Sequence, residues 1–208
     1  MSVLPSLASA LGSRSSEANI ALAQQIASSE NHEAIDELIV NLRNKDNRIQ
    51  GDCIKTLYEI GYIKPELIAD YHADFLGLLS RKNNRMVWSG MIALLTITDL
   101  KSKEVFAALD LIMETVQKGS VITIDCGVGI LAKLNCYEAY FDTTDPLLLE
   151  QLWKCPIKQL ASYAEKAFAS ITDKNREAYR NLLEKRKGEC KKATQMKRLQ
   201  KVLNKIAQ

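Results

Sequence analysis

The stretch from Asn84 to Ile97 reads Asn-Arg-Met-Val-Trp-Ser-Gly-Met-Ile-Ala-Leu-Leu-Thr-Ile, and the rest of the chain is best understood around it. It has the length of a helix, almost no charge, and apolar residues on nearly every side. A helix that is apolar all round must be covered by neighbours on more than one side. The stretch is too short, and too interrupted by Ser89 and Thr96, to cross a membrane. We therefore predict an inner helix with similar helices before and after it.

The composition of the whole chain favours helices. Its 208 residues suffice for one domain or one short array of repeats. Gly, Pro and aromatic residues are few, whereas Ala, Leu, Ile, Lys and Glu, which favour helices, are plentiful. No stretch alternates convincingly between polar and apolar residues, so we expect almost no sheet. These features predict an all-α protein.

The cysteines and histidines argue against a metal site. The five cysteines form no Cys-x-x-Cys pair, and neither His32 nor His72 lies near a cysteine in sequence. We expect no metal and no cofactor. An odd number of scattered cysteines fits a reducing compartment. The first residues lack a positively charged start and include Pro5, so we expect no secretory signal and a cytoplasmic protein.

Charge is distributed unevenly along the chain. From Lys185 to Gln208 there are nine Lys or Arg and one acid, Glu189, which gives +8. The preceding 184 residues carry nineteen bases and twenty-four acids, which gives −5. The sequence therefore predicts a mildly acidic body and a strongly basic tail.

Capping and breaking residues divide the chain into helices. Ser16 and Ser102 are expected to cap helices, Gly61 to end one, Pro65 to open the next, and Asp145-Pro146 to start another. The helices predicted from these signals and from apolar periodicity cover residues 17–28, 32–44, 47–60, 66–80, 84–97, 103–118, 120–134, 147–153, 156–171, 175–187 and 191–207.

Four of these helices repeat one pattern. Anchored at Asn47, Asn84, Ser120 and Lys158, they recur at steps of 37, 36 and 38 residues. Positions 3, 7, 11 and 14 share one face. Positions 3, 11 and 14 are apolar, with Lys133 the one exception, and position 7 is always small, which lets a partner helix approach closely. The residues in question are Ile49, Met86, Ile122 and Leu160; Cys53, Gly90, Cys126 and Ala164; Leu57, Leu94, Ile130 and Phe168; and Ile60, Ile97, Lys133 and Ile171.

This pattern resembles the second-helix signature of HEAT repeats. The signature is seen as Met86, Gly90, Ala93-Leu94 and Ile97, and again as Leu160, Ala164, Ala167-Phe168 and Ile171. The Arg that often follows the first hydrophobic position in that family is absent, since Gln50, Val87, Thr123 and Ala161 stand there. The resemblance covers His32 to Gln208.

The resemblance implies an α-α superhelix of about five helix pairs. We expect an N-terminal segment and capping helix over residues 1–30, a repeat array over 31–187, and a basic capping helix over 188–208. The alternative is an irregular helical bundle in which the near-periodicity is accidental.

The inner helices of such an array line a concave surface that commonly binds ligands. One interpretation is a groove with an apolar middle and basic ends, suited to a peptide or an amphipathic helix. The other is that the apolar middle belongs to the core. The candidate residues are Arg48, Lys55, Arg85, Trp88, Ile92, Ile124, Asp125, Val128 and Lys166.

Three of these residues have a second interpretation. Certain bacterial alkylpurine DNA glycosylases are built from HEAT-like repeats and use an Asp, a Trp and an Arg on the concave face. Trp88, Asp125 and Arg85 look superficially similar, but the local motifs of that family do not match, so no catalytic role is transferred. A buried or capping carboxylate accounts for Asp125 equally well.

The basic tail is the other candidate surface. If residues 191–207 form one helix, Met196, Leu199, Leu203 and Ile206 share one side. One interpretation is that the cations form a surface that binds nucleic-acid phosphates or an acidic partner. The other is that they are the charged outer side of a terminal helix that covers the end of the array. These cations are Lys191, Lys197, Arg198, Lys201 and Lys205.

Motifs that carry chemistry are absent from the sequence. There is no Gly-rich phosphate loop, nucleophile elbow, spaced carboxylate pair or His-containing catalytic arrangement. We therefore predict no catalytic residues and a non-enzymatic scaffold or adaptor that binds a protein or peptide. The alternative is a nucleic-acid-binding protein of the same architecture.

Overall fold

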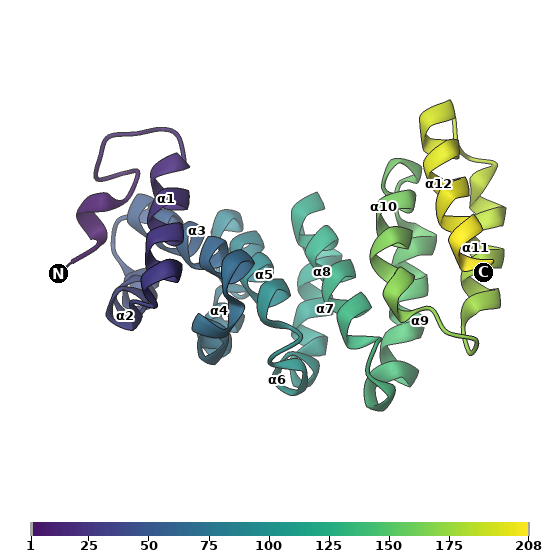
Figure 1. The fold of residues 1–208 in the computed structure, drawn as a ribbon, viewed down its shortest axis with the longest axis horizontal. Coiled ribbons are helices and arrows are strands. Elements are labelled where there is room, and N and C mark those ends of the chain that lie inside the picture. The colour runs from purple at the N-terminus through teal and green to yellow at the C-terminus, as the bar shows by residue number, and fades with distance from the viewer. Residues whose placement is uncertain (1, 208) are drawn as a thin grey trace. The chain divides into compact units, whose positions relative to one another are not determined.

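The structure, a computed structural model, describes residues 2–207 and forms only helices within them (Figure 1). This confirms the all-α prediction. The α-helices are α1 (Glu17–Ser29), α2 (His32–Val40), α3 (Asn47–Ile63), α4 (His72–Leu78), α5 (Asn84–Ile97), α6 (Ser102–Ala107), α7 (Leu109–Lys118), α8 (Val121–Leu134), α9 (Glu138–Lys154), α10 (Ile157–Ala167), α11 (Arg176–Lys187) and α12 (Ala193–Ile206). Short 3₁₀ turns cover Leu4–Ser6, Asn41–Arg43, Pro65–Leu67, Ala69–Tyr71 and Phe168–Ser170.

The chain divides into two compact units, Met1–Cys126 and Gly127–Gln208, with the boundary inside α8. In the N-terminal unit, α3 packs between α1 and α5 in one layer, while α2 packs against α3 and α4 against α5 (Figure 1). In the C-terminal unit, α10 packs against α12, and α9 packs against α11. Each unit therefore has two layers of helices with the core between them.

The helix α5 begins and ends where the sequence predicts. Its first turn is capped by Asn83, whose side chain accepts a hydrogen bond from the Arg85 amide at 3.0 Å. Most of its side chains are buried, Met86, Ala93, Leu94 and Ile97 among them. A Cβ on Gly90 would lie 3.0 Å from the carbonyl oxygen of Phe75 in α4. The small residue at position 7 therefore permits close packing, as predicted.

The prediction that Gly61 ends a helix is wrong. The helix α3 continues to Ile63, and Gly61 lies where α3 meets α5. A Cβ there would overlap Oγ1 of Thr96, which a close-packed interior could not accommodate without movement. This glycine is needed for close approach of two helices rather than for termination of one.

The predicted start of a helix at Asp145-Pro146 is also wrong. The helix α9 begins nine residues earlier than predicted, at Glu138, and contains Pro146 in its interior. Proline is usually disfavoured in the interior of a helix because it lacks the N–H that donates a hydrogen bond to the preceding turn. Here Pro146 is exposed, while Asp145 is buried and hydrogen-bonded within the unit.

Several other predicted helix boundaries differ from the structure. Ser16 makes no side-chain cap, and the Glu17 amide donates instead to Oγ of Ser15 at 3.2 Å. Ser102 starts α6 without capping it. The predicted helix over 66–80 becomes two 3₁₀ turns and the short α4, and the one over 103–118 is divided at Ala108 into α6 and α7.

Two predicted core positions lie at the surface. Ile122 in the first turn of α8 is 45% exposed. Phe168 is 38% exposed because α10 ends at Ala167 and the chain turns into a 3₁₀ helix. The position-7 residues Cys53, Cys126 and Ala164 are buried, so the repeated packing face is confirmed at its closest contacts and fails at Ile122 and Phe168.

The N-terminal segment packs against the first repeat helices. Leu7 is buried, and the amide of Ala8 donates to Oδ1 of Asn19 in α1 at 2.9 Å. The amide of Ser9 donates to Oδ2 of Asp52 in α3 at 2.7 Å, and Asn19 donates to the other oxygen of Asp52 at 2.9 Å. The segment is therefore tied to α1 and α3 through two buried polar side chains.

Candidate functional site

Two close contacts fix how α3 and α5 lie side by side in the N-terminal unit. A Cβ on Gly51 would lie 2.8 Å from Cζ of Arg85, and one on Gly61 would touch Thr96. Residues of α3 therefore lie level with residues about 34 positions later in α5, so Lys55 and Trp88 lie at nearly the same height along the two helices. We call the surface formed by Lys55, Glu59, Tyr62, Arg85 and Trp88 the α3–α5 face.

Charged and aromatic side chains interact along α3 on this face. Nζ of Lys55 lies 2.5 Å from Oε1 of Glu59 and 4.7 Å from the ring centre of Tyr58. Burial lowers the pKa of Lys55, but bonding to Glu59 and Tyr58 raises it by more, so its pKa lies above the ordinary value. The Tyr58 and Tyr62 rings meet edge to face at 6.0 Å.

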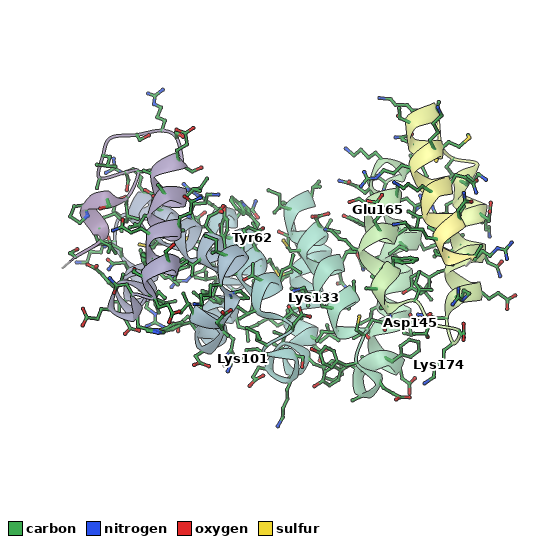
Figure 2. The ribbon with its side chains drawn as sticks, viewed as in Figure 1. Tyr62, Lys101, Lys133, Asp145, Glu165 and Lys174 are labelled. Carbon is green, nitrogen blue, oxygen red and sulfur yellow. The ribbon has the colours of Figure 1, made fainter. Side chains whose placement is uncertain are left out.

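Each helix of the α3–α5 face contributes an aromatic side chain that reaches the surface at least in part. Tyr62 is 59% exposed, and Figure 2 shows it on the side of the N-terminal unit opposite Lys101. Trp88 is half-buried. The face thus combines aromatic surface with a paired cation and anion, a mixture suited to contacts with both apolar and polar groups of a partner.

Arg85 is held at the N-terminal end of the same face. Its Nη2 donates to the carbonyl oxygen of Gly51 at 3.4 Å and lies 3.8 Å from Oδ1 of Asp52. Its side chain remains 48% exposed. Asp52 also accepts hydrogen bonds from the Ser9 amide and from the side chain of Asn19. The carboxylate near Arg85 is therefore held in place by other groups.

The other candidates predicted for the concave surface are dispersed. Arg48 is exposed, but its Nη2 lies 2.8 Å from Oδ2 of Asp46, the N-cap residue of α3. Ile92 and Val128 lie in the core, at 8% and 0% exposure. Ile124 and Asp125 in α8 are half-buried. Two of the candidates, Val128 and Lys166, belong to the C-terminal unit. Lys166 is half-buried on α10, and its Nζ lies 5.9 Å from the ring centre of Tyr163.

A second candidate surface lies on α10 and α12 of the C-terminal unit. Nε and Nη2 of Arg198 donate to the two carboxylate oxygens of Glu165, at 2.8 and 2.5 Å. The hydrogen bond from Arg198 is the largest cause that holds the pKa of Glu165 below its ordinary value, and Lys205 and Lys201 act in the same direction. Figure 2 shows Glu165 on the side of this unit opposite Lys174.

Of the remaining predicted cations, Lys201 and Lys205 lie close enough to Glu165 to lower its pKa. Lys197 and Lys201 are exposed on α12, and Nζ of Lys205 lies 5.6 Å from the ring centre of Phe168. Lys191 is exposed just before α12. We call Glu165, Phe168, Lys197, Arg198, Lys201 and Lys205 the α10–α12 face.

Arg186 does not belong to the basic surface, although it lies in the basic tail. It is 6% exposed, and its Nη1 donates to the carbonyl oxygens of Leu152 and Cys155, both at 2.8 Å. Its Nε and Nη2 donate to Glu189 at 3.0 and 2.8 Å. This cation closes the C-terminal end of α9, where carbonyls lack partners within the helix.

A buried polar cluster joins α9, α11 and the end of α8 in the C-terminal unit. Oδ1 of Asp145 accepts hydrogen bonds from Asn135, Asn175 and Tyr179 at 3.0, 2.7 and 3.0 Å. Burial raises the pKa of Tyr179, and the charge of Asp145 adds to the effect, so the phenol remains a donor. All four side chains are 8% exposed or less. This arrangement stabilises the fold, because each of these donors finds an acceptor.

Sequence reasoning misses two exposed aromatic residues, Tyr62 and Phe168. A helix that ends at Gly61 leaves Tyr62 outside it, and the repeat pattern assigns Phe168 to the packing face. The signal for Tyr62 is its spacing from Lys55 and Glu59, which places these three residues on one side of a continuous helix.

Two general properties of the described residues bear on the possible ligands. No helix within residues 2–207 is long and apolar enough to span a membrane. Across the same residues, no three His, Cys, Asp or Glu side chains are grouped closely enough to hold a metal ion. The five cysteines are free thiols, of which Cys136 is exposed.

No protein-family model matches the chain, and no curated protein sequence matches it either. Solved structures do match it. A designed armadillo repeat protein has a TM-score of 0.65 and 16% identity, over 98% of this chain and 99% of its own. A second, solved in complex with the peptide (KR)4, has a TM-score of 0.67 and 16% identity, over 90% and 91%. An engineered protein has a TM-score of 0.63 and 18% identity, over 100% and 97%. The chain therefore has the armadillo- and HEAT-type α-solenoid fold, an all-α architecture of stacked helical repeats.

Proposed function

We propose that this protein is a non-enzymatic scaffold or adaptor that binds a peptide segment of another protein on the α3–α5 face. The observation that carries the proposal is the half-buried Trp88, which lies at nearly the same height on α5 as Lys55 on the neighbouring α3. Partly exposed Trp and Tyr side chains are the residues that contribute most often and most strongly to binding free energy at protein interfaces.

The chemistry of the α3–α5 face supports this choice. Trp88 and Tyr62 offer flat apolar surface at a small cost in side-chain entropy. The ion pair of Lys55 and Glu59 offers both a donor and an acceptor to the backbone of an extended peptide. A solved designed armadillo repeat protein in complex with the peptide (KR)4 shows that a protein of this fold binds a peptide.

The experiment uses peptides selected from a random displayed library on the full chain. Their affinity is then measured by fluorescence anisotropy for the native protein and for Trp88→Ala. We expect the substitution to weaken binding at least about tenfold, because loss of a central aromatic contact commonly costs about 2 kcal/mol or more.

Trp153→Ala is the matched control, because Trp153 is the other tryptophan of the chain, is 48% exposed, and lies on α9 in the C-terminal unit. Urea unfolding of both variants separates binding from folding. The α3–α5 face would be excluded as the binding site by equal loss of affinity in the two variants. It would also be excluded if Trp88→Ala lost much stability but kept its affinity.

Salt dependence gives an independent check. A contact dominated by aromatic surface should change little in affinity between low and physiological salt, whereas binding to phosphates weakens steeply. A steep salt dependence of the selected peptides would contradict a site centred on Trp88.

A further inference from the structure

The C-terminal unit carries most of the positive charge of the protein. Residues 127–208 contain sixteen Lys or Arg and nine Asp or Glu, a net charge of +7, whereas residues 1–126 have a net charge of −4. The imbalance is greatest on α10 and α12, which together hold six cations and one acid, Glu165. A surface with such an excess attracts anions.

The arrangement of these cations is specific. Arg198 already holds one carboxylate through both arms of its guanidinium group, that of Glu165 on the neighbouring helix. Lys197 and Lys201 are exposed, and Lys201 lies close enough to Glu165 to lower its pKa. Lys205 lies over the exposed ring of Phe168, which adds an apolar patch beside the cations.

We propose that the α10–α12 face binds an acidic peptide segment of a partner protein. Lys197, Lys201 and Lys205 receive its carboxylates, and Phe168 receives an apolar side chain. Glu165 acts as an internal competitor that occupies Arg198 in the absence of the partner. The residues differ from those of the α3–α5 face, so this binding activity is separate from the one proposed above.

Spacing favours an extended peptide. Lys197, Lys201 and Lys205 are four residues apart on α12, which corresponds to a rise of about 6 Å from one to the next. Side chains on the same side of an extended chain recur about every 6.6–6.8 Å. Carboxylates on alternate residues of a peptide laid along α12 would therefore meet successive lysines.

The aromatic content of the surface argues against single-stranded nucleic acid. Such ligands need several aromatic side chains on which successive bases stack. The α10–α12 face has one, Phe168, and Nζ of Lys205 lies 5.6 Å from its ring centre. The bidentate grip of Arg198 on Glu165 also shows that a carboxylate fits the guanidinium fork in this setting.

The first test measures anisotropy of a labelled peptide in which Glu alternates with Leu and Ser, with a matched peptide containing Gln in place of Glu. We expect the full chain to bind the Glu peptide at low salt and the Gln peptide at least about tenfold more weakly. The double variant Lys201→Glu, Lys205→Glu should lose at least about tenfold in affinity, because each reversal replaces attraction with repulsion.

The control for charge is the double variant Lys185→Glu, Lys187→Glu, which makes the same change on α11. It should retain affinity within about threefold. Circular dichroism of Lys201→Glu, Lys205→Glu should match the native protein, since both lysines are exposed. The same measurement checks that the control variant is folded.

The second test examines Glu165 directly. Glu165→Gln should release Arg198 and tighten binding of the Glu peptide about threefold to fivefold. Glu184→Gln on α11, which removes a carboxylate paired with Lys187, should leave the affinity unchanged.

Three results would overturn the proposal. They are no binding of the Glu peptide at low salt, equal loss in the two double variants, or weaker binding after Glu165→Gln. A single-stranded or duplex oligonucleotide that binds more tightly than the Glu peptide, and is lost in Lys201→Glu, Lys205→Glu, would assign the surface to nucleic acid instead.

Discussion

At the level of single residues, the carboxylate of Asp145 connects several helices of the C-terminal unit through hydrogen bonds. A single oxygen of Asp145 accepts three hydrogen bonds from side chains that are otherwise shut off from water. Sequence reasoning assigns Asp145 to a helix start, because Asp before Pro is a common start signal. Its true partners, Asn135, Asn175 and Tyr179, lie ten or more residues away, and no local rule could have indicated them.

Replacing Asp145 with Ala should cost the C-terminal unit about 3 kcal/mol of unfolding free energy, because three buried donors lose their acceptor. Tyr179→Phe, which removes one donor and leaves two, should cost about 1 kcal/mol. Urea unfolding followed by circular dichroism measures both.

Asp142→Ala is the control for that comparison, since Asp142 is exposed about one turn earlier on the same helix. It should change stability by no more than about 0.5 kcal/mol. A loss as large as that of Asp145→Ala would show that removal of a negative charge from this part of α9, and not the buried cluster, accounts for the effect.

At the scale of the element, helices occur wherever apolar periodicity is strong, and their ends are the weak point of the prediction. The full range of α5 is predictable because its cap, Asn83, and its apolar residues are local features. The end of α3 and the start of α9 are not, because Gly61 serves a contact outside its own helix and Pro146 is tolerated within one. Because the predicted helix ends before Tyr62, the sequence does not predict Tyr62 as an exposed residue of α3.

Gly61→Ala should destabilise the protein by about 2 kcal/mol, because the new methyl group would overlap Thr96 and force α3 and α5 apart. Gly77→Ala is the matched control: beyond the nearby backbone of α4 itself, no atom lies within 4 Å of the position its methyl group would take, and alanine favours helices. We expect it to be neutral or stabilising by up to about 1 kcal/mol. Thermal unfolding compares the two, and equal effects would contradict the close packing of α3 on α5.

At the scale of the whole molecule, stability should be local. Repeat proteins are held together by contacts between neighbouring elements, so a defect spreads less far than in a single globular core. The division into two compact units, Met1–Cys126 and Gly127–Gln208, fits this description.

Hydrogen exchange measured by mass spectrometry tests the local character of stability. In Asp145→Ala we expect faster exchange in α9, α10 and α11 and little change in α1, α3 and α5. In Gly61→Ala we expect the reverse. Faster exchange throughout the chain in either variant would show that the two units unfold together.

The helical class, the recurrence of four helices with a small residue at the closest contact, and the basic tail are all predictable from the amino-acid sequence, because they depend on periodicity and composition. Which residues of each helix reach solvent is known only once the helices are packed. The packing places Ile92, Val128 and Arg186 inside and leaves Tyr62 and Phe168 exposed. The physical reason is that the exposed fraction of a side chain depends on the helices packed beside it, and those come from distant parts of the chain.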